Sequence, residues 1–396
     1  MRCTFLHRTQ LEAVLSHTTS NPTQGWIKPL RAAALLVTCA CAAAPASAQW
    51  TITDLGSVSA VDINNSGQVV GTITATGDRA FLWQNGIMTH LGDLPGGTDF
   101  SHATGINNSG QVVGFSNAST GNRAFLWQNG TMTDLGELPG GPNRSNAYGI
   151  NDAGLVVGSS AIRVNIFTGS TGTVGTLWNN GTLSNLGDLP GGVTDSSALS
   201  INSTGQMVGF GTSGTGTRGV LWQNGTIINL GDLPGGADYS AAVDINDAGT
   251  VVGSSIATDG PSAFSWTNGA LTDLGDLPGG GTYSQANGIN NLGQVVGFGT
   301  SDAGSRAVQW SDGVLSDLNT FAGVAGSGWR LQQAKAINDL GQIVGVGYNP
   351  DGVLRSFILT PVPEPEHWAM LLAGLGITGW AARRSHQPST SRQLVA

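Results

Sequence analysis

Residues 103–140 read ATGINNSGQVVGFSNASTGNRAFLWQNGTMTDLGELPG, and this stretch decides the fold because the chain repeats it. Its segment Ile-Asn-x-x-Gly-x-x-Val-Gly occurs seven times, at intervals of 43 to 51 residues, and an Ala always stands four residues before the Asn. Self-similarity at such a period indicates one repeated supersecondary unit. The seven Asn residues are Asn64, Asn107, Asn151, Asn202, Asn246, Asn290 and Asn338.

Each unit divides into four short strands separated by turn residues. In the quoted copy we expect the strands at residues 103–107, 111–115, 123–127 and 131–135. The first two are joined by Asn-x-x-Gly and the last two by Asn129-Gly130, a strong hairpin signal because both residues accept positive φ. The Leu-Pro-Gly-Gly that ends most units is a turn. The sequence therefore predicts an all-β, antiparallel architecture.

Four-stranded units of this length have the size of a propeller blade, so we expect a seven-bladed β-propeller over residues 49–361. An unpaired fourth-strand segment, residues 51–55, precedes the first unit, and the seventh unit ends without one. We therefore expect residues 51–55 to pair with residues 355–359 and complete the last blade, because open sheet edges are avoided. The recurring Ala fits the innermost strand. An open β-solenoid is the alternative.

Composition excludes several classes of protein. Gly accounts for 61 of 396 residues and charged residues for only 10%, which disfavours helical bundles. Between Gln49 and Pro361, 8 Arg and 1 Lys stand against 21 Asp and 1 Glu, a net charge of −13. Such a body repels nucleic acid, so we expect no nucleic-acid partner. All three Cys precede residue 49, which leaves the body without disulfides or thiolate sites.

The first 48 residues have the features of a secretory signal peptide. Arg31 precedes an apolar run, and Ala46-Ser47-Ala48 is a small-x-small cleavage site before Gln49. We expect removal of residues 1–48 and export of the body.

The other end, residues 362–396, combines a motif, an apolar run and a basic cluster. Pro363-Glu364-Pro365 precedes 15 mostly apolar residues, about 22 Å as a helix, and then Arg383-Arg384. By physics alone this is a short transmembrane tether with the Arg pair on the cytoplasmic side. The pattern closely resembles the PEP-CTERM sorting signal. That resemblance implies processing by an exosortase at the inner membrane, and release to the cell surface or an exopolysaccharide matrix.

The units of the body in turn resemble HAF repeats of extracellular bacterial proteins. The matching text is Gly149-Ile-Asn-x-x-Gly with Val-Val-Gly158, and Arg79-Ala-Phe-Leu-Trp-Gln-Asn-Gly86. The resemblance covers nearly all of residues 49–361. It implies an exported repeat protein and no particular activity.

Candidate binding residues lie at one end of the units, where the longer links gather. Trp329 and Arg330 stand in a link without counterpart elsewhere, so they are candidate ligand contacts, with local packing as the alternative. The acids before Leu-Pro could ring the propeller mouth and hold Ca²⁺; turn capping is their alternative role. These acids are Asp93, Glu137, Asp188, Asp232 and Asp276.

Two other patterns favour structural roles. The Trp that ends the third strand of most units has the period of the core, so we expect packing rather than sugar stacking. The stretches from Asp62 to Gly67 and from Asp244 to Gly249 look like calcium loops, but no acid closes them.

The function we expect is a non-catalytic surface or matrix scaffold that contacts polysaccharide or surface proteins. Near-identical units without a cluster of unusual His, Ser or acidic residues favour it, and we assign no catalytic residue and no required cofactor. The alternative is a glycan-degrading enzyme, a lyase or hydrolase, because the spatial separation of acid pairs cannot be read from sequence.

Overall fold

The structure, a computed structural model, describes residues 49–74, 77–165 and 167–362. The expected signal peptide with Ala46 and Ala48 lies outside these residues, as does the expected sorting signal with Pro363, Glu364, Pro365, Arg383 and Arg384. Within the described ranges, no helix has the length and apolar character needed to cross a membrane. The described body is all-β apart from the short 3-10 helix η2 (Leu318–Thr320).

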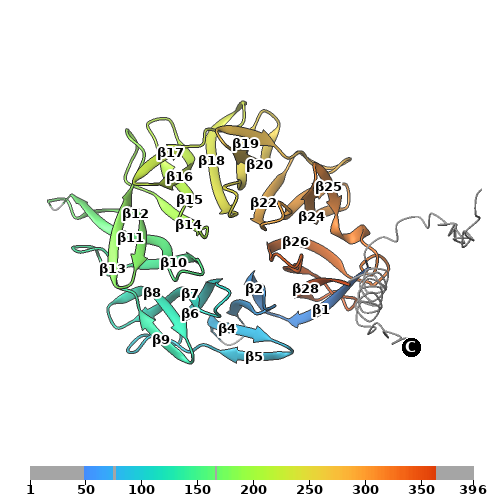
Figure 1. Ribbon diagram of the computed structural model, residues 1–396, viewed down its shortest axis with the longest axis horizontal. Coiled ribbons are helices and arrows are strands. Elements are labelled where there is room, and N and C mark those ends of the chain that lie inside the picture. Colours follow the sequence, from blue (N-terminus) through green and yellow to red (C-terminus); the bar gives the residue numbers. More distant parts are fainter. Residues whose placement is uncertain (1–48, 75–76, 166, 363–396) are drawn as a thin grey trace, which may run out of the picture. The chain divides into compact units, whose positions relative to one another are not determined.

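Successive groups of four antiparallel strands make up the body, as the repeat predicts (Figure 1). The first group is β2 (Ser59–Ile63), β3 (Val69–Ile73), β4 (Arg79–Gln84) and β5 (Ile87–His90). The second is β6 (Ser101–Ile106), β7 (Val112–Ala118), β8 (Gly121–Gln128) and β9 (Thr131–Asp134). The third is β10 (Ser145–Ile150), β11 (Val156–Asn165), β12 (Ser170–Asn179) and β13 (Thr182–Gly187).

The fourth and fifth groups join into one eight-stranded sheet through a single parallel bridge between Thr217 and Tyr239. The fourth is β14 (Ser197–Ile201), β15 (Met207–Thr212), β16 (Thr217–Gln223) and β17 (Thr226–Asn229). The fifth is β18 (Gly235–Ile245), β19 (Val251–Ala257), β20 (Gly260–Thr267) and β21 (Ala270–Asp273). The sixth is β22 (Ser284–Ile289), β23 (Val295–Ser301), β24 (Gly304–Ser311) and β25 (Val314–Asp317).

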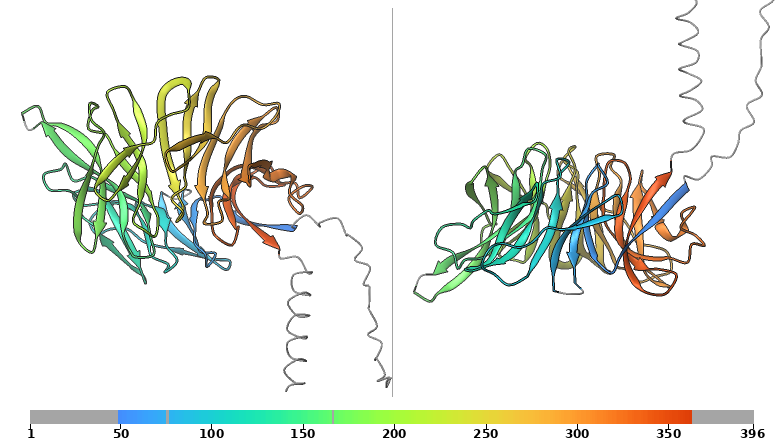
Figure 2. Two further views of the ribbon diagram at one scale, coloured as in Figure 1. Left: turned by 45° about the horizontal axis from the view of Figure 1, so that its top comes forward. Right: turned by 90° about the horizontal axis from the view of Figure 1, so that it is seen from below.

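The seventh group combines the two ends of the body, which confirms the expected pairing. It contains β26 (Arg330–Ile337), β27 (Ile343–Tyr348), β28 (Leu354–Val362) and β1 (Gln49–Gly56). β1 pairs antiparallel with β28, with Ile52 opposite Leu359, and Figure 2 shows the two strands side by side. The first and last groups are also neighbours, because β2 contacts β26 and β27.

The groups follow one another around a central axis, with the first strand of each group nearest that axis (Figure 1). The recurring Ala of this strand is buried in all seven copies, at 0–3% exposure, as expected for a crowded innermost position. Hydrophobic clusters lie between neighbouring groups; one, for example, joins Val70 and Ala80 to Val112 and Phe125.

The Trp series belongs to these clusters, as expected. Four of its members are buried, and Trp83 and Trp127 pack against clusters from partly buried positions. The four buried members are Trp178, Trp222, Trp266 and Trp310.

Candidate functional site

The recurring Asn side chains form a closed belt of hydrogen bonds around the axis. Asn64 Nδ2 donates to the carbonyl of Asn107 in the next group at 3.0 Å, and the same link recurs until Asn338 Nδ2 donates to the Asn64 carbonyl at 2.9 Å. Asn64 Oδ1 meanwhile accepts from the backbone N–H of Gln68 at 3.0 Å. Because both ends of the amide are used within the protein, this Asn is a structural residue.

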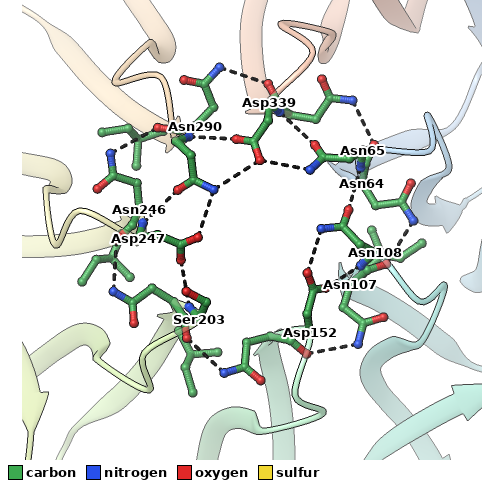
Figure 3. Close-up of a pocket in the computed structure, with 18 of the residues that line it drawn as sticks. Asn64, Asn65, Asn107, Asn108, Asp152, Ser203, Asn246, Asp247, Asn290 and Asp339 are labelled. Carbon is green, nitrogen blue, oxygen red and sulfur yellow. Dashed lines mark hydrogen bonds between the residues drawn. The ribbon is translucent and has the colours of Figure 1, made fainter.

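The residue after each Asn forms a second belt at the same end of the axis (Figure 3). In six of the seven positions its side-chain oxygen accepts the backbone N–H of the preceding group, as when Asn108 accepts from Asn65 at 2.8 Å. Together the belts line a polar pocket of about 180 Å³. Its three carboxylates, Asp152, Asp247 and Asp339, all accept N–H groups of neighbouring groups.

A larger cavity, of about 420 Å³, is lined mainly by residues from the innermost strands. The residue three positions before each recurring Asn contributes to its lining. These seven residues are Val61, Thr104, Tyr148, Leu199, Val243, Asn287 and Lys335. We call them the axial residues.

A β-bulge explains the direction of the axial residues. In every innermost strand the register shifts between the residues on either side of the axial residue, as between Ala198 and Ser200 around Leu199. A bulge adds an unpaired residue and re-aims its side chain. The partner strand comes very close here: a Cβ added to Gly209 would lie 2.0 Å from the Ser197 carbonyl oxygen.

Two carboxylates border the cavity, one position after the axial residue. Asp62 accepts from the N–H of Ile63 at 2.8 Å and of Ile106 at 2.9 Å, and thereby ties the first group to the second. The pKa of Asp62 is raised from 3.8 to about 7, chiefly because burial disfavours the charged form. The two N–H donors oppose this effect and the charge of Asp244 adds to it.

Asp244 occupies the equivalent position of the fifth group. It accepts from Ser200 Oγ at 2.6 Å and from the N–H groups of Ile245 and Ile289, both at 2.9 Å. Burial raises its pKa as well, despite these three donors. Asp62 and Asp244 therefore tie neighbouring groups together.

Lys335 is the cation of the cavity and the one Lys of the body. Burial lowers the pKa of its ammonium group, and within the described chain Lys335 makes no side-chain hydrogen bond or ion pair. The axial residues were not among those predicted from sequence. Comparing the units position by position would have found them, because the axial position varies between a constant Ala and a constant Ile-Asn.

Four of the five acids before Leu-Pro contact groups of their own neighbourhood, and one oxygen of the fifth, Asp276, is buried without a hydrogen-bond partner. Glu137 lies 3.2 Å from Arg123 Nη1 and Asp232 lies 3.5 Å from Arg218 Nη2. Asp188 accepts the N–H of Leu189 at 2.7 Å, Asp93 accepts from Ser101 Oγ at 3.3 Å, and burial raises the pKa of Asp276. These contacts do not unite the five around one ion, and among the described residues no three His, Cys, Asp or Glu side chains gather to hold a metal.

Trp329 and Arg330 lie together but in different environments. Trp329 is half-buried and packs edge-on against the buried Phe357, with ring centroids 6.2 Å apart. Arg330 is exposed, and its guanidinium carbon lies 4.8 Å from the centre of the Tyr348 ring. Part of the Trp329 side chain is therefore used in packing, and the exposed Arg330 remains available to contact a ligand.

No family model matches the chain, and no curated protein sequence is significantly similar to it. Among solved structures, a protein of unknown function from Dyadobacter fermentans DSM 18053 matches with a TM-score of 0.37 at 12% identity. The match covers 80% of this chain and 99% of the other.

Proposed function

We propose that the chain is an exported, non-catalytic binding scaffold whose body is a seven-bladed β-propeller. The closed belt of Asn hydrogen bonds is the observation that supports the propeller. It links each four-stranded group to the next and returns from Asn338 to Asn64. The pairing of β1 with β28 supports the same arrangement, because it completes the last blade.

The hydrogen bonds that the repeated polar residues make within the protein support a non-catalytic role. Nucleophiles and general acids or bases must be free to meet a substrate. The belt amides, Asp62, Asp244 and four of the five acids before Leu-Pro instead contact neighbouring groups of the protein. We therefore propose that the molecule holds a polysaccharide or a surface protein without turnover. An acidic polymer would need a divalent bridge such as Ca²⁺, since the body carries −13.

Export rests on the two end segments. Cleavage after Ala48 and exosortase processing near Pro363 to Pro365 would take the protein from a membrane-tethered intermediate to the surface or the matrix. Mass analysis of the surface form of the full chain tests this: we expect an N-terminus at Gln49 and loss of Arg384. A mature protein that retains Arg384 rejects the sorting signal.

A glycan-degrading enzyme is the second candidate. One observation favours it: Asp62 has a pKa near 7 and borders the same cavity as Asp244. A protonated carboxyl group together with a second carboxylate is the pair that glycoside hydrolysis requires. Incubating the mature protein with neutral and acidic glycans separates the candidates. Release of a product that disappears in both Asp62→Asn and Asp244→Asn would establish the enzyme.

A further inference from the structure

The axial residues vary between two constant parts of the repeated unit. The flanking Ala and Ile-Asn recur seven times because the same packing and the same belt recur. The axial position carries six different residue types in seven copies, including the one Lys of the body. The packing requirements are the same in all seven copies. The different residues at this position therefore indicate a function to which each copy contributes a different side chain.

The variety is ordered around the axis. Tyr148, Leu199 and Val243 come from three successive groups and form an apolar arc. Asn287 and Lys335 come from the next two groups, and Asp62 follows in the group after them. One side of the cavity is therefore mainly apolar and the other mainly polar. Such a lining is typical of sites that orient a small molecule, and 420 Å³ is within their range of about 300–1,000 Å³.

Several polar groups of the lining have capacity left for a ligand. Lys335 has no hydrogen-bond partner among the described residues. The side-chain nitrogen of Asn287 donates to the Ala334 carbonyl at 2.7 Å, and the side-chain oxygen of Asn287 can still accept a hydrogen bond from a ligand. The Tyr148 hydroxyl oxygen accepts a hydrogen bond from Asn146 Nδ2 at 3.3 Å, which leaves its O–H group able to donate to a ligand. Asp62 and Asp244 oxygens still have acceptor capacity beyond their N–H donors. Donors and acceptors are therefore mixed along the lining, with Asn287, Lys335 and Asp62 on its polar side and Tyr148 and Asp244 on its apolar side.

The geometry points to a binding site for a small, uncharged, polyhydroxylated molecule, a monosaccharide or the end unit of a glycan. Its hydroxyl groups would meet the mixed donors and acceptors of Asn287, Lys335 and Asp62. Its C–H face would pack on the apolar arc, with the Tyr148 ring as the largest surface. Burial disfavours the charged forms of Asp62, Asp244 and Lys335, so the lining offers no strong opposite charge to an anion or to a cation. The inference rests on the proposed binding function and moves the contact from Trp329 and Arg330 to the axis.

The chain itself supplies replacements that keep the bulge. Val occupies the axial position in the first group and Thr in the second, so Tyr148→Val and Lys335→Thr preserve a geometry already present elsewhere. Arg163→Ala is the matched control, since Arg163 is exposed and lies outside the cavity. Thermal unfolding of each variant first verifies that the fold is retained.

Binding of sugars to the mature protein, obtained by processing of the full chain, is measured by saturation-transfer NMR and calorimetry. The probes are glucose, galactose, mannose and N-acetylglucosamine, with glucuronate and glucosamine as the charged counterparts, each up to about 10 mM. We expect at least one neutral sugar to bind. In the Tyr148→Val/Lys335→Thr double variant we expect its Kd to rise by about tenfold or more. Arg163→Ala should leave its Kd unchanged, and Arg330→Ala tests the loop face separately.

Three results overturn the axial site: no neutral sugar binds, a charged counterpart binds more tightly, or the double variant binds as the wild type does. If Arg330→Ala alone weakens binding, the contact lies on the loop face and only the axial inference fails. If a bound sugar or glycan is converted, the non-catalytic proposal fails while the axial site stands.

Discussion

The side-chain amide of the recurring asparagine both accepts and donates structural hydrogen bonds. Its Oδ1 accepts the N–H groups that close the turn between the first two strands, and its Nδ2 reaches the carbonyl of the next group. Aspartate at this position would place a second acceptor against a carbonyl, and serine has a shorter side chain with only one polar atom. These needs explain why the sequence repeats Asn seven times without exception.

Asp62 gives the stability of the protein a pH dependence that can be measured. Its pKa is about 7 in the folded state and 3.8 in the unfolded state, so the folded state holds a proton over that window. The free energy of unfolding therefore falls as pH rises from about 4 towards 7 and levels off above it. Because the carboxylate borders a water-accessible cavity, we expect a loss of about 1–2 kcal/mol between pH 5 and pH 8.

Urea unfolding of wild type and Asp62→Asn at pH 5 and pH 8 checks this expectation. The Asn variant retains the size of the side chain but does not titrate. Its free energy of unfolding should therefore fall between pH 5 and pH 8 by about 1–2 kcal/mol less than that of the wild type. Equal losses in both proteins would show that the Asp62 proton does not contribute.

At the level of strands, the sequence predicted the pairing order better than the strand ends. The Asn-Gly hairpins form as expected, with φ of 50° at Asn129 and 83° at Gly130. The strands of the second group, however, extend to Ala118 in β7 and begin at Gly121 in β8, beyond the expected 115 and 123. Backbone pairing continued through polar residues there, because hairpin hydrogen bonds do not depend on apolar side chains.

The bulge in each innermost strand could not be predicted, because register is a property of two strands and the motif describes each one alone. The candidate site was missed for the same reason. The recurring Ala and Trp were correctly assigned to the core, since burial recurs with the period of the unit. The direction of the axial residues instead depends on a one-residue shift against the second strand.

The same bulge predicts that one glycine of strand β15 cannot be replaced. Gly209→Ala would place a methyl group 2.0 Å from the backbone oxygen of Ser197, which a side-chain rotation cannot relieve. We expect a loss of about 3 kcal/mol or more in the free energy of unfolding. Gly281→Ala is the control, because its added Cβ would lie 3.5 Å from Thr300 Oγ1, an ordinary contact. Comparable urea midpoints for the two variants would contradict the close approach.

For the whole molecule, the sequence indicated which ends meet but not what lies at the centre. A spare fourth strand at the start and a missing one at the end predicted the contact of β1 with β28. The axial cavity is assembled from seven strands spread over the whole body. Its size, and the ordering of apolar and polar sides, appear only when these strands are brought together.

Removal of residues 49–56 tests the importance of the pairing of β1 with β28. It would expose one edge of β28 and take Leu55 and the partly buried Trp50 and Ile52 from their clusters. We expect calorimetry of the truncated mature protein to show a Tm lower by about 10 °C or more. Thr53→Val, an exposed change within β1, should leave Tm within about 2 °C of the wild type. A truncated protein as stable as the Thr53→Val variant would argue against a closing role.

The position of the two ends has a mechanical consequence. Gln49 pairs with Val362, so a pull applied at Val362 enters β28, which is bonded to β1 on one side and β27 on the other. Hydrogen bonds in antiparallel sheets lie perpendicular to the strands, so tension along β28 loads both rows in shear. The two rows then resist together, whereas bonds peeled from a free edge break one after another. Under the proposed export, the tail beyond Val362 would therefore attach to the strand best able to bear force.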